Sequence, residues 1–207
     1  DNGTLWVNSA GNYADSQHWN GTWNDPDGDD FMEFDGGDEN LTLTGGSQAD
    51  IWLNWDDWAE KNDDYDLHVY NDSGGRIGNS TDVQNGSSAN PGEHYADEDL
   101  PSTIHLRIER VDATGEADFD IWFLGNYEPE YWTAERSVVN PAVGPNVTTT
   151  GAVYYDTLAL RRFSSRGPTI DGRIKPDLTA PDGVSTSTYN TFSGTSAAAP
   201  HAGGVAA

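Results

Sequence analysis

The 207-residue chain contains no cysteine and only two lysines, Lys61 and Lys175. Without cysteine, neither disulfide bonds nor thiolate chemistry can contribute to its stability or its function. Basic residues are scarce in general, because ten of them face 35 acidic residues and leave a formal net charge of −25. A surface of that sign repels nucleic acid and anionic membranes, so we expect no partnership with either.

Long apolar runs are also missing, since none approaches the ~18 residues of a membrane span. The first residues carry no signal-peptide features. The acidic composition suits a protein that stays soluble in high salt, where self-repulsion is screened, and the simpler interpretation is an acidic secreted protein. Sequons at Asn20, Asn40 and Asn146 are compatible with the extracellular location that we expect.

Short apolar runs that alternate with polar residues fill the middle of the chain. They occupy 31–34, 41–44, 51–55, 65–70, 104–108 and 119–123, with Gly, Asn and Asp between them. Period-two alternation with turn residues indicates antiparallel strands that bury one face. About one hundred residues can form a core of their own, so we predict a jelly-roll-like β-sandwich domain over 19–126.

The strongest functional signal lies near the end, in the string Gly194-Thr195-Ser196-Ala197-Ala198-Ala199-Pro200-His201. A turn led by glycine runs into small residues of high helix propensity, which would place the Ser196 hydroxyl at a helix N-terminus beside unpaired N–H groups. That position suits a nucleophile whose attack produces an oxyanion. In an isolated Gly-Thr-Ser, an N-cap serine is the commoner reading. The whole string, however, resembles the active-site serine motif of subtilisin-like serine proteases (subtilases), with Ala197 where Met is usual.

Three upstream blocks resemble the same family and appear in its order. The β-branched run 147–153 resembles a subtilase strand, 160–168 resembles the following Phe-Ser-Ser-Arg-Gly-Pro segment, and 175–184 resembles Lys-Pro-Asp-x-x-Ala-Pro-Gly-Val. In the last block Asp182 stands as an additional residue before the glycine. An ordered series of blocks that ends at the serine is more specific than any single motif.

The opening run 5–9, followed by Ala10-Gly11-Asn12, resembles the subtilase strand that ends in Ala-Gly-Asn. Alone, this pattern indicates only a strand that enters a turn. The resemblance implies that Asn12 donates to the oxyanion, a role that suits a neutral amide donor. It also implies that Ser9, Ala10 and Gly11 form a wall of the pocket for the residue before the cleaved bond.

The resemblance implies an α/β fold, a partial subtilisin-like parallel-sheet domain interrupted by the antiparallel β-sandwich. Its first segment would be 1–18, with the oxyanion strand, and its second 127–207, with the nucleophile. Inside the insert, 62–75 resembles a stretch of pre-peptidase C-terminal (PPC-like) domains. The function implied is a serine endopeptidase that cleaves peptide bonds through an acyl-enzyme on Ser196.

Subtilase chemistry also needs an Asp and a His, which precede the serine in the chain. Neither motif is present. His201 follows Ser196 by five residues, about 140° round the helix, and points elsewhere. Asp72-Ser73-Gly74 imitates the Asp motif, but it follows Asn12 where the family's Asp precedes the oxyanion Asn, and a hairpin turn explains it. We therefore read the chain as the C-terminal part of a subtilase catalytic domain, inactive alone and partnered by the missing N-terminal part and by peptide substrates.

No cofactor is required for this chemistry, and we assign no metal ligands. Aspartates at alternate loop positions are compatible with calcium, but the full EF-hand spacing is absent, and solvated acidic loops are the simpler interpretation. These residues are Asp25, Asp27, Asp29 and Asp30, with Asp63, Asp64 and Asp66. A competing hypothesis is non-enzymatic: the β domain binds or stabilises, and the flanks are a protease-derived scaffold.

Overall fold

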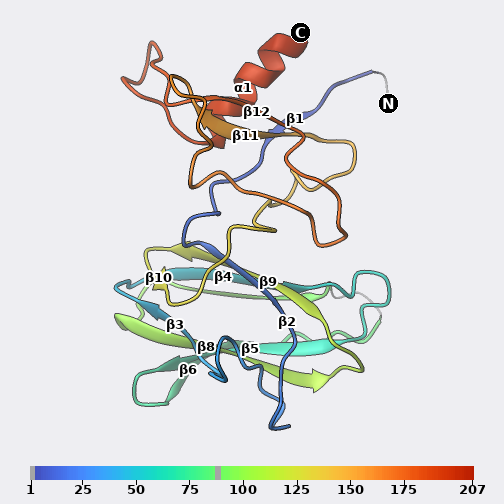
Figure 1. The fold of residues 1–207 in the computed structure, drawn as a ribbon. Helices are drawn as coiled ribbons and strands as arrows, with labels where there is room; N and C mark the ends of the chain where they lie inside the picture. The colour runs from blue at the N-terminus through green and yellow to red at the C-terminus, as the bar shows by residue number, and fades with distance from the viewer. Residues whose placement is uncertain (1–2, 87–89) are drawn as a thin grey trace. The chain divides into compact units, whose positions relative to one another are not determined.

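The computed structural model describes residues 3–86 and 90–207. The chain divides into two compact units, coloured continuously along the sequence in Figure 1. Unit 1 combines Asp1–Asp15 with Thr133–Ala207, and unit 2 is Ser16–Trp132. We expected the changes of domain after residues 18 and 126, and the structure instead assigns residues 16–18 and 127–132 to unit 2.

Unit 2 consists of two antiparallel sheets that share one core (Figure 1). The five-stranded sheet has the order β10-β3-β8-β5-β6, and the four-stranded sheet has the order β2-β9-β4-β7. The first contains β3 (Leu41–Thr44), β5 (Asp64–Asn71), β6 (Arg76–Ser80), β8 (Thr103–Asp112) and β10 (Glu128–Pro129). The second contains β2 (His18–Thr22), β4 (Ala49–Trp55), β7 (Gly92–Asp97) and β9 (Asp118–Gly125).

The core of unit 2 is built from the alternate residues that the sequence pattern marks as apolar. In β4 the burial alternates along the strand, with Ile51, Leu53 and Trp55 inside. Tyr65 and Phe119 meet edge to face with ring centroids 4.9 Å apart, and Trp55 packs on Tyr65 at 5.3 Å. Such pairs contribute about 0.5–1.5 kcal/mol each beyond the burial of apolar area.

One predicted strand is wrong. The run 31–34 forms only an isolated bridge, from Phe31 to Glu109, although Met32 and Phe34 are buried. Backbone bonds from Met32 to Ile108 and from Phe34 to Asp38 tie this segment down one residue at a time. The segment therefore buries alternate side chains without pairing as a strand. Alternation of apolar and polar residues does not by itself distinguish these two cases.

Unit 1 contains a three-stranded parallel sheet with the order β1-β11-β12 and one helix. Its strands are β1 (Val7–Ser9), β11 (Thr148–Tyr154) and β12 (Leu178–Asp182), and the helix is α1 (Thr195–Ala206). Figure 1 shows α1 beside these strands. Ala152, Ala180 and Ala198 form the contact, and because their side chains are small, helix and sheet approach closely. Within the described residues, no helix has the length and apolar character needed to cross a membrane.

Candidate functional site

The ends of the parallel strands in unit 1 gather the residues that the sequence singles out. Asn12 follows β1, Asp182 is the last residue of β12, and α1 begins at Thr195. Parallel strands present their carboxyl ends at one edge, where open α/β sheets usually place their sites. The first turn of α1 lies at this edge, because backbone and side-chain contacts join it to Asn12 and to Asp182.

Asn12 is bonded directly to the turn that carries Ser196. Its Oδ1 accepts hydrogen bonds from the Thr195 N–H at 2.9 Å and from the Thr195 hydroxyl at 3.0 Å. Gly11 N–H donates in turn to Thr195 Oγ1 at 3.2 Å. With its oxygen held in this way, the Asn12 amide directs its NH₂ group away from Thr195, and this group has no hydrogen-bond partner in the described part of the chain.

Gly194 gives the turn its shape. Its φ of 116° lies where L side chains are strained, and an added Cβ would lie 3.2 Å from Asn12 Nδ2. Gly194 is also the N-cap of α1, and no side chain caps this helix. Ser196 is therefore not the N-cap that an isolated Gly-Thr-Ser suggests.

Ser196 is exposed, and neither its hydroxyl nor its N–H has a hydrogen-bond partner among residues 3–86 and 90–207. The Thr195 N–H is taken by Asn12, and the Ala197 N–H donates to Gly194 O at 2.9 Å. The Ser196 N–H is thus an open donor of the first turn, where the helix dipole favours negative charge. A hydroxyl, a backbone donor and a nearby side-chain amide can serve as the nucleophile and the oxyanion donors of acyl transfer, which also requires a base.

Asp182 and Arg161 support the turn from beneath. Asp182 is fully buried, and its Oδ1 accepts the Gly194 N–H at 2.5 Å. Arg161 Nε lies 2.9 Å from Oδ2 as an ion pair, although the angle there is not that of a hydrogen bond. The guanidinium also lies 5.3 Å from the ring centre of Tyr154 and 5.1 Å from that of Phe163. Sequence reasoning noticed Asp182 only as an added residue and did not foresee this contact.

The segment Ser9-Ala10-Gly11 is held rigidly at its backbone. Ser9 pairs with Thr150 in the sheet, and Ala10, which is fully buried, donates its N–H to Thr150 O at 3.0 Å. Gly11 has a φ of 107°, and its carbonyl accepts the Ser165 N–H at 3.0 Å. Ser165 comes from the block that resembles Phe-Ser-Ser-Arg-Gly-Pro, so that block fixes the strand end beside Asn12.

The five histidines are engaged elsewhere. Four of them contact carboxylates inside unit 2, and His201 bonds the Ala197 carbonyl on its own helix at 2.8 Å through Nδ1. The four pairs are His18 with Asp120, His68 with Glu109, His94 with Asp50 and His105 with Asp72. The Asp72-Ser73-Gly74 segment is a turn, in which Asn71 Oδ1 accepts the N–H groups of Ser73 and Gly75. Among the described residues, no histidine is hydrogen-bonded to Ser196.

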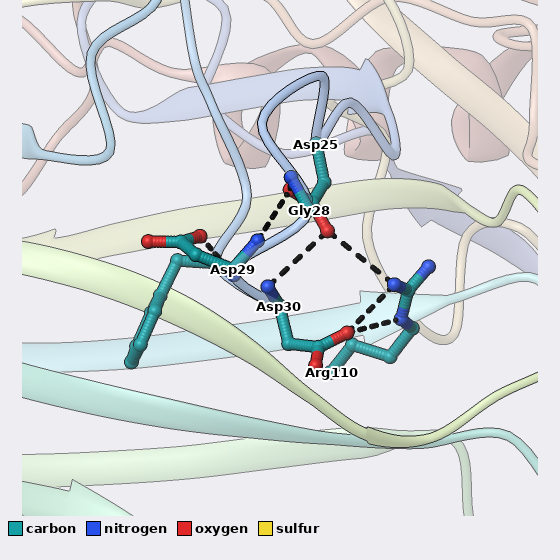
Figure 2. A network of polar contacts seen from close by, with 6 residues as sticks. Asp25, Gly28, Asp29, Asp30 and Arg110 are labelled. Atoms are coloured by element: carbon teal, nitrogen blue, oxygen red, sulfur yellow. Dashed lines mark hydrogen bonds and ion pairs between the residues drawn. The ribbon is translucent and has the colours of Figure 1, made fainter.

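Two carboxylate clusters have the spacing of metal ligands. In the first, Asp25, Asp27 and Asp29 lie within 4.8 Å of one another. Figure 2 shows that the Asp25 carboxylate already accepts the N–H groups of Gly28 and Asp30 and contacts Arg110, which also pairs with Asp30 at 2.7 Å. The Asp25 and Asp29 carboxylates of this cluster are therefore already bonded by backbone N–H groups of the turn and, at Asp25, by an arginine.

The second cluster consists of Asp66, His68 and Glu109. His68 Nε2 lies 2.7 Å from Glu109 Oε2, and Arg76 donates to Nδ1 at 3.4 Å. With Nδ1 as the acceptor, Nε2 carries the proton and donates to Glu109, so both ring nitrogens are used. A neighbouring guanidinium also opposes a bound cation.

Comparison with known proteins identifies the family of this chain. A protein-family model described as the subtilase family, Peptidase S8, matches residues 31–207. The chain therefore belongs to the subtilase family of serine peptidases. Its structure is similar to that of the Clostridium perfringens CspB protease, with a TM-score of 0.68 and 20% sequence identity. The likeness covers 98% of this chain and 47% of that protein, so this chain spans about half the length of its structural relative.

Proposed function

We propose that this chain supplies the nucleophile and the oxyanion donors of a subtilisin-type serine endopeptidase. Ser196 is the nucleophile, and the Asn12 side chain and the Ser196 N–H bind the oxyanion. Ser9, Ala10 and Gly11 line the pocket for the residue that precedes the cleaved bond. The observation that carries the proposal is the bonding of Asn12 to the Thr195 turn, which joins segments 183 residues apart in sequence beside an exposed serine.

In the proposed reaction, Ser196 Oγ attacks a peptide carbonyl while a histidine takes its proton and an aspartate orients that histidine. The carbonyl oxygen becomes the oxyanion between Asn12 Nδ2 and the Ser196 N–H. The histidine then protonates the leaving amine, and water hydrolyses the acyl-enzyme. No cofactor takes part. Since the histidines of this chain are engaged elsewhere, we propose that both partners come from a part of the catalytic domain outside residues 1–207.

The surface of unit 1 is consistent with contact to the rest of the catalytic domain. Large apolar side chains are exposed on it, among them Trp6 at 55%, Leu158 at 68% and Ile174 at 86%. A protein normally buries such side chains against more of its own domain or against a partner. We propose that the rest of the subtilase domain covers part of this surface. We also propose that unit 2 is a PPC-like, jelly-roll-like insert, on the resemblance of residues 62–75, and that the enzyme is extracellular and salt-adapted, in keeping with its acidic composition.

A fluorophosphonate probe tests the nucleophile. On residues 1–207 alone, we expect labelling of Ser196 no faster than background, because no base activates it. In a longer chain that contains the Asp and His segments, we expect stoichiometric labelling, which Ser196→Ala abolishes. Ser193→Ala, which alters an exposed serine of the same turn, should keep it.

Rapid labelling of residues 1–207 alone would overturn the proposed inactivity of this chain. Failure of the longer, folded chain to be labelled at Ser196 would overturn the protease assignment. That outcome would favour the alternative, in which unit 2 binds or stabilises and unit 1 is a scaffold without catalysis.

A further inference from the structure

A cleft of about 230 Å³ lies on the outward face of the five-stranded sheet in unit 2. Tyr70, His105 and Arg107 line it, and they alternate along β5 and β8 with residues of the buried core. Its other polar side chains come from Asn40, from Asn71 at the end of β5 and from Asp72 in the following turn. Because pockets for drug-sized ligands measure about 300–1,000 Å³, this cleft suits a ligand of about one ring.

The charges in and around the cleft favour a neutral ligand. Its lining includes one guanidinium, that of Arg107, and one carboxylate, that of Asp72. Glu39 pairs with Arg107 at 2.8 Å and balances its charge. Unit 2 as a whole carries 28 acidic and four basic residues. This field repels an anion, while Arg107 opposes a cation inside the cleft itself.

Three contacts hold the Arg107 side chain in place. Its Nε donates to Asn40 Oδ1 at 2.9 Å, and its Nη1 forms the pair with Glu39. The guanidinium carbon lies 5.1 Å from the ring centre of Tyr70, a distance at which a cation and an aromatic ring attract each other. Within the described residues Nη2 has no hydrogen-bond partner. Arg107 therefore offers a donor whose position its neighbours fix.

The turn after β5 supplies a second donor and an acceptor. Asn71 Oδ1 accepts two backbone N–H groups, at 3.1 and 3.0 Å, which assigns the oxygen to the turn and leaves Nδ2 without a partner in the described part of the chain. Asp72 Oδ1 lies 3.1 Å from His105 Nε2, and His105 Nδ1 lies 3.1 Å from the Thr42 hydroxyl. Because a carboxylate only accepts, His105 donates to Asp72 and orients it. Among residues 3–86 and 90–207, Asp72 Oδ2 accepts no further hydrogen bond.

We propose that this cleft binds one neutral sugar residue, either as a free sugar or within a glycan chain. A sugar hydroxyl both donates and accepts, so neighbouring hydroxyl groups can bond the Arg107 and Asn71 donors and the Asp72 acceptor together. The C–H surface of the sugar ring matches the aromatic ring of Tyr70. An apolar ligand would leave these polar groups unpaired. Because neighbours already hold the polar side chains, binding has few of them left to order.

The cleft uses residues of unit 2 alone, so the inference is independent of whether Ser196 is catalytic. Saturation-transfer NMR on the 1–207 chain tests it. With glucose, galactose, mannose and N-acetylglucosamine as probes, we expect saturable binding of at least one, with a Kd of roughly 1–10 mM, since so small a ligand gains a limited total free energy. The uronic acid of that sugar should bind several-fold more weakly at low salt, because unit 2 repels its carboxylate.

Immobilised neutral oligosaccharides distinguish the two sources of the sugar. Binding of the 1–207 chain to both the free sugar and the oligosaccharides supports a site for which one residue suffices. Binding to the oligosaccharides alone supports a site that recognises the sugar within a chain.

Two variants remove the charged groups of the cleft. Arg107→Met and Asp72→Ala should each weaken sugar binding roughly tenfold or more, since each removes hydrogen bonds of a charged group. Asp50→Ala is the matched control, because Asp50 also pairs with a histidine, His94 at 2.7 Å, but on the other sheet. Trp52→Ala tests the exposed tryptophan of that sheet. Both controls should leave binding within about twofold, because they lie outside the cleft.

Three results would overturn the proposal. The first is the lack of saturable binding of any neutral sugar, free or immobilised. The second is a uronic acid that binds as tightly as its neutral counterpart or more tightly. The third is binding that Asp50→Ala or Trp52→Ala abolishes, or that Arg107→Met and Asp72→Ala leave unchanged. Asp72 has a side chain that is 71% exposed, so Asp72→Ala leaves the core intact, and circular dichroism confirms the fold of each variant.

Discussion

The two units of this chain are held together in different ways. Unit 2 encloses a continuous core of large side chains, including Trp55, Tyr65 and Phe119, between two sheets. Between sheet and helix, unit 1 has a small cluster of three alanines with Phe163 and Ala202 at its edge, and its other buried apolar side chains are alanines and valines. In place of bulky side chains, unit 1 buries hydroxyl groups and charges that bond its backbone.

In unit 1, buried polar side chains hold backbone segments together by hydrogen bonds. Lys175 is buried and donates to Val147 O at 2.6 Å and to Asp177 at 2.7 Å. Ser164 is buried and accepts the Ala152 N–H at 3.0 Å. Hydrogen bonds fix direction, whereas hydrophobic burial mainly supplies stability. Unit 2 therefore owes its stability mainly to apolar burial, whereas the polar contacts of unit 1 hold a backbone turn in one geometry.

The largest expected effect is on the core of unit 2. Phe119→Ala should lower its free energy of unfolding by about 3–5 kcal/mol, because the ring is fully buried between Tyr65 and Trp23. Denaturation followed by tryptophan fluorescence measures this, since Trp6 is the one tryptophan in unit 1. Phe163→Ala, at the edge of the alanine core, should leave that transition unchanged. A loss below about 1 kcal/mol for Phe119→Ala would mean that unit 2 does not depend on this core.

The next largest expected effect concerns the hydrogen-bond donor of the Asn12 side chain. Asn12→Asp keeps an oxygen acceptor for Thr195 and removes the amide donor. In the longer chain that contains the Asp and His segments, kcat should fall roughly 100- to 1,000-fold, the range known from removing one oxyanion-hole amide in a subtilisin. KM and Tm should change little. If Asn12→Asp leaves kcat unchanged, the side chain of Asn12 only braces the turn.

Asp182 tests whether the turn depends on its buried brace. Asp182→Ala leaves the Gly194 N–H without its acceptor and Arg161 without its partner, at a cost of about 1–3 kcal/mol in the stability of unit 1. Asp182→Asn keeps an oxygen for the N–H and should recover most of the labelling rate of Ser196 in the longer chain. Tyrosine fluorescence and fluorophosphonate labelling follow the two effects. Equal labelling rates in all three proteins would show that the brace does not position the nucleophile.

The smallest effect is a difference in the response to acid. Burial raises the pKa of Asp64 and of Glu93 in unit 2, so their charged forms destabilise the fold near neutral pH. In unit 1, burial alone would raise the pKa of Asp177, but hydrogen bonds from Lys175 and from the Thr149 N–H lower it overall. As the pH falls from neutral towards the ordinary pKa range of carboxyl groups, the folded unit 2 binds more protons than its unfolded form, and acidification stabilises it.

Below about pH 4, where the unfolded Asp177 takes up a proton first, the stabilisation that this residue gives to unit 1 is lost. Urea midpoints at pH 7, 5 and 3.5, read by tryptophan for unit 2 and by tyrosine for the whole chain, separate the units. Asp177→Asn should remove the part of the stability of unit 1 that is lost in acid. If the unit 2 midpoint falls between pH 7 and pH 5, the buried carboxyls of Asp64 and Glu93 do not govern its pH response.

Local pattern was informative where one face of a strand is buried. The runs 41–44, 51–55, 65–70, 104–108 and 119–123 all lie within observed strands. The same rule failed at 31–34, because a segment that crosses a sheet can bury alternate residues without pairing along its length. Aspartates that looked alike in sequence also have different surroundings. Asp64 lines a cleft together with Gln84, whereas Asp66 lies close to His68 and Glu109.

What the sequence alone determined is the family, the alternation of the strands, the acidic surface and the serine at the start of a helix of small residues. Only the tertiary structure decided that Asp182 holds Gly194, that Asn12 accepts from Thr195, and that Gln84 leaves an oxygen unpaired beside Asp64. The physical reason is that composition and periodicity act within a few residues, whereas these contacts depend on strand order and register, which bring together positions far apart in the chain.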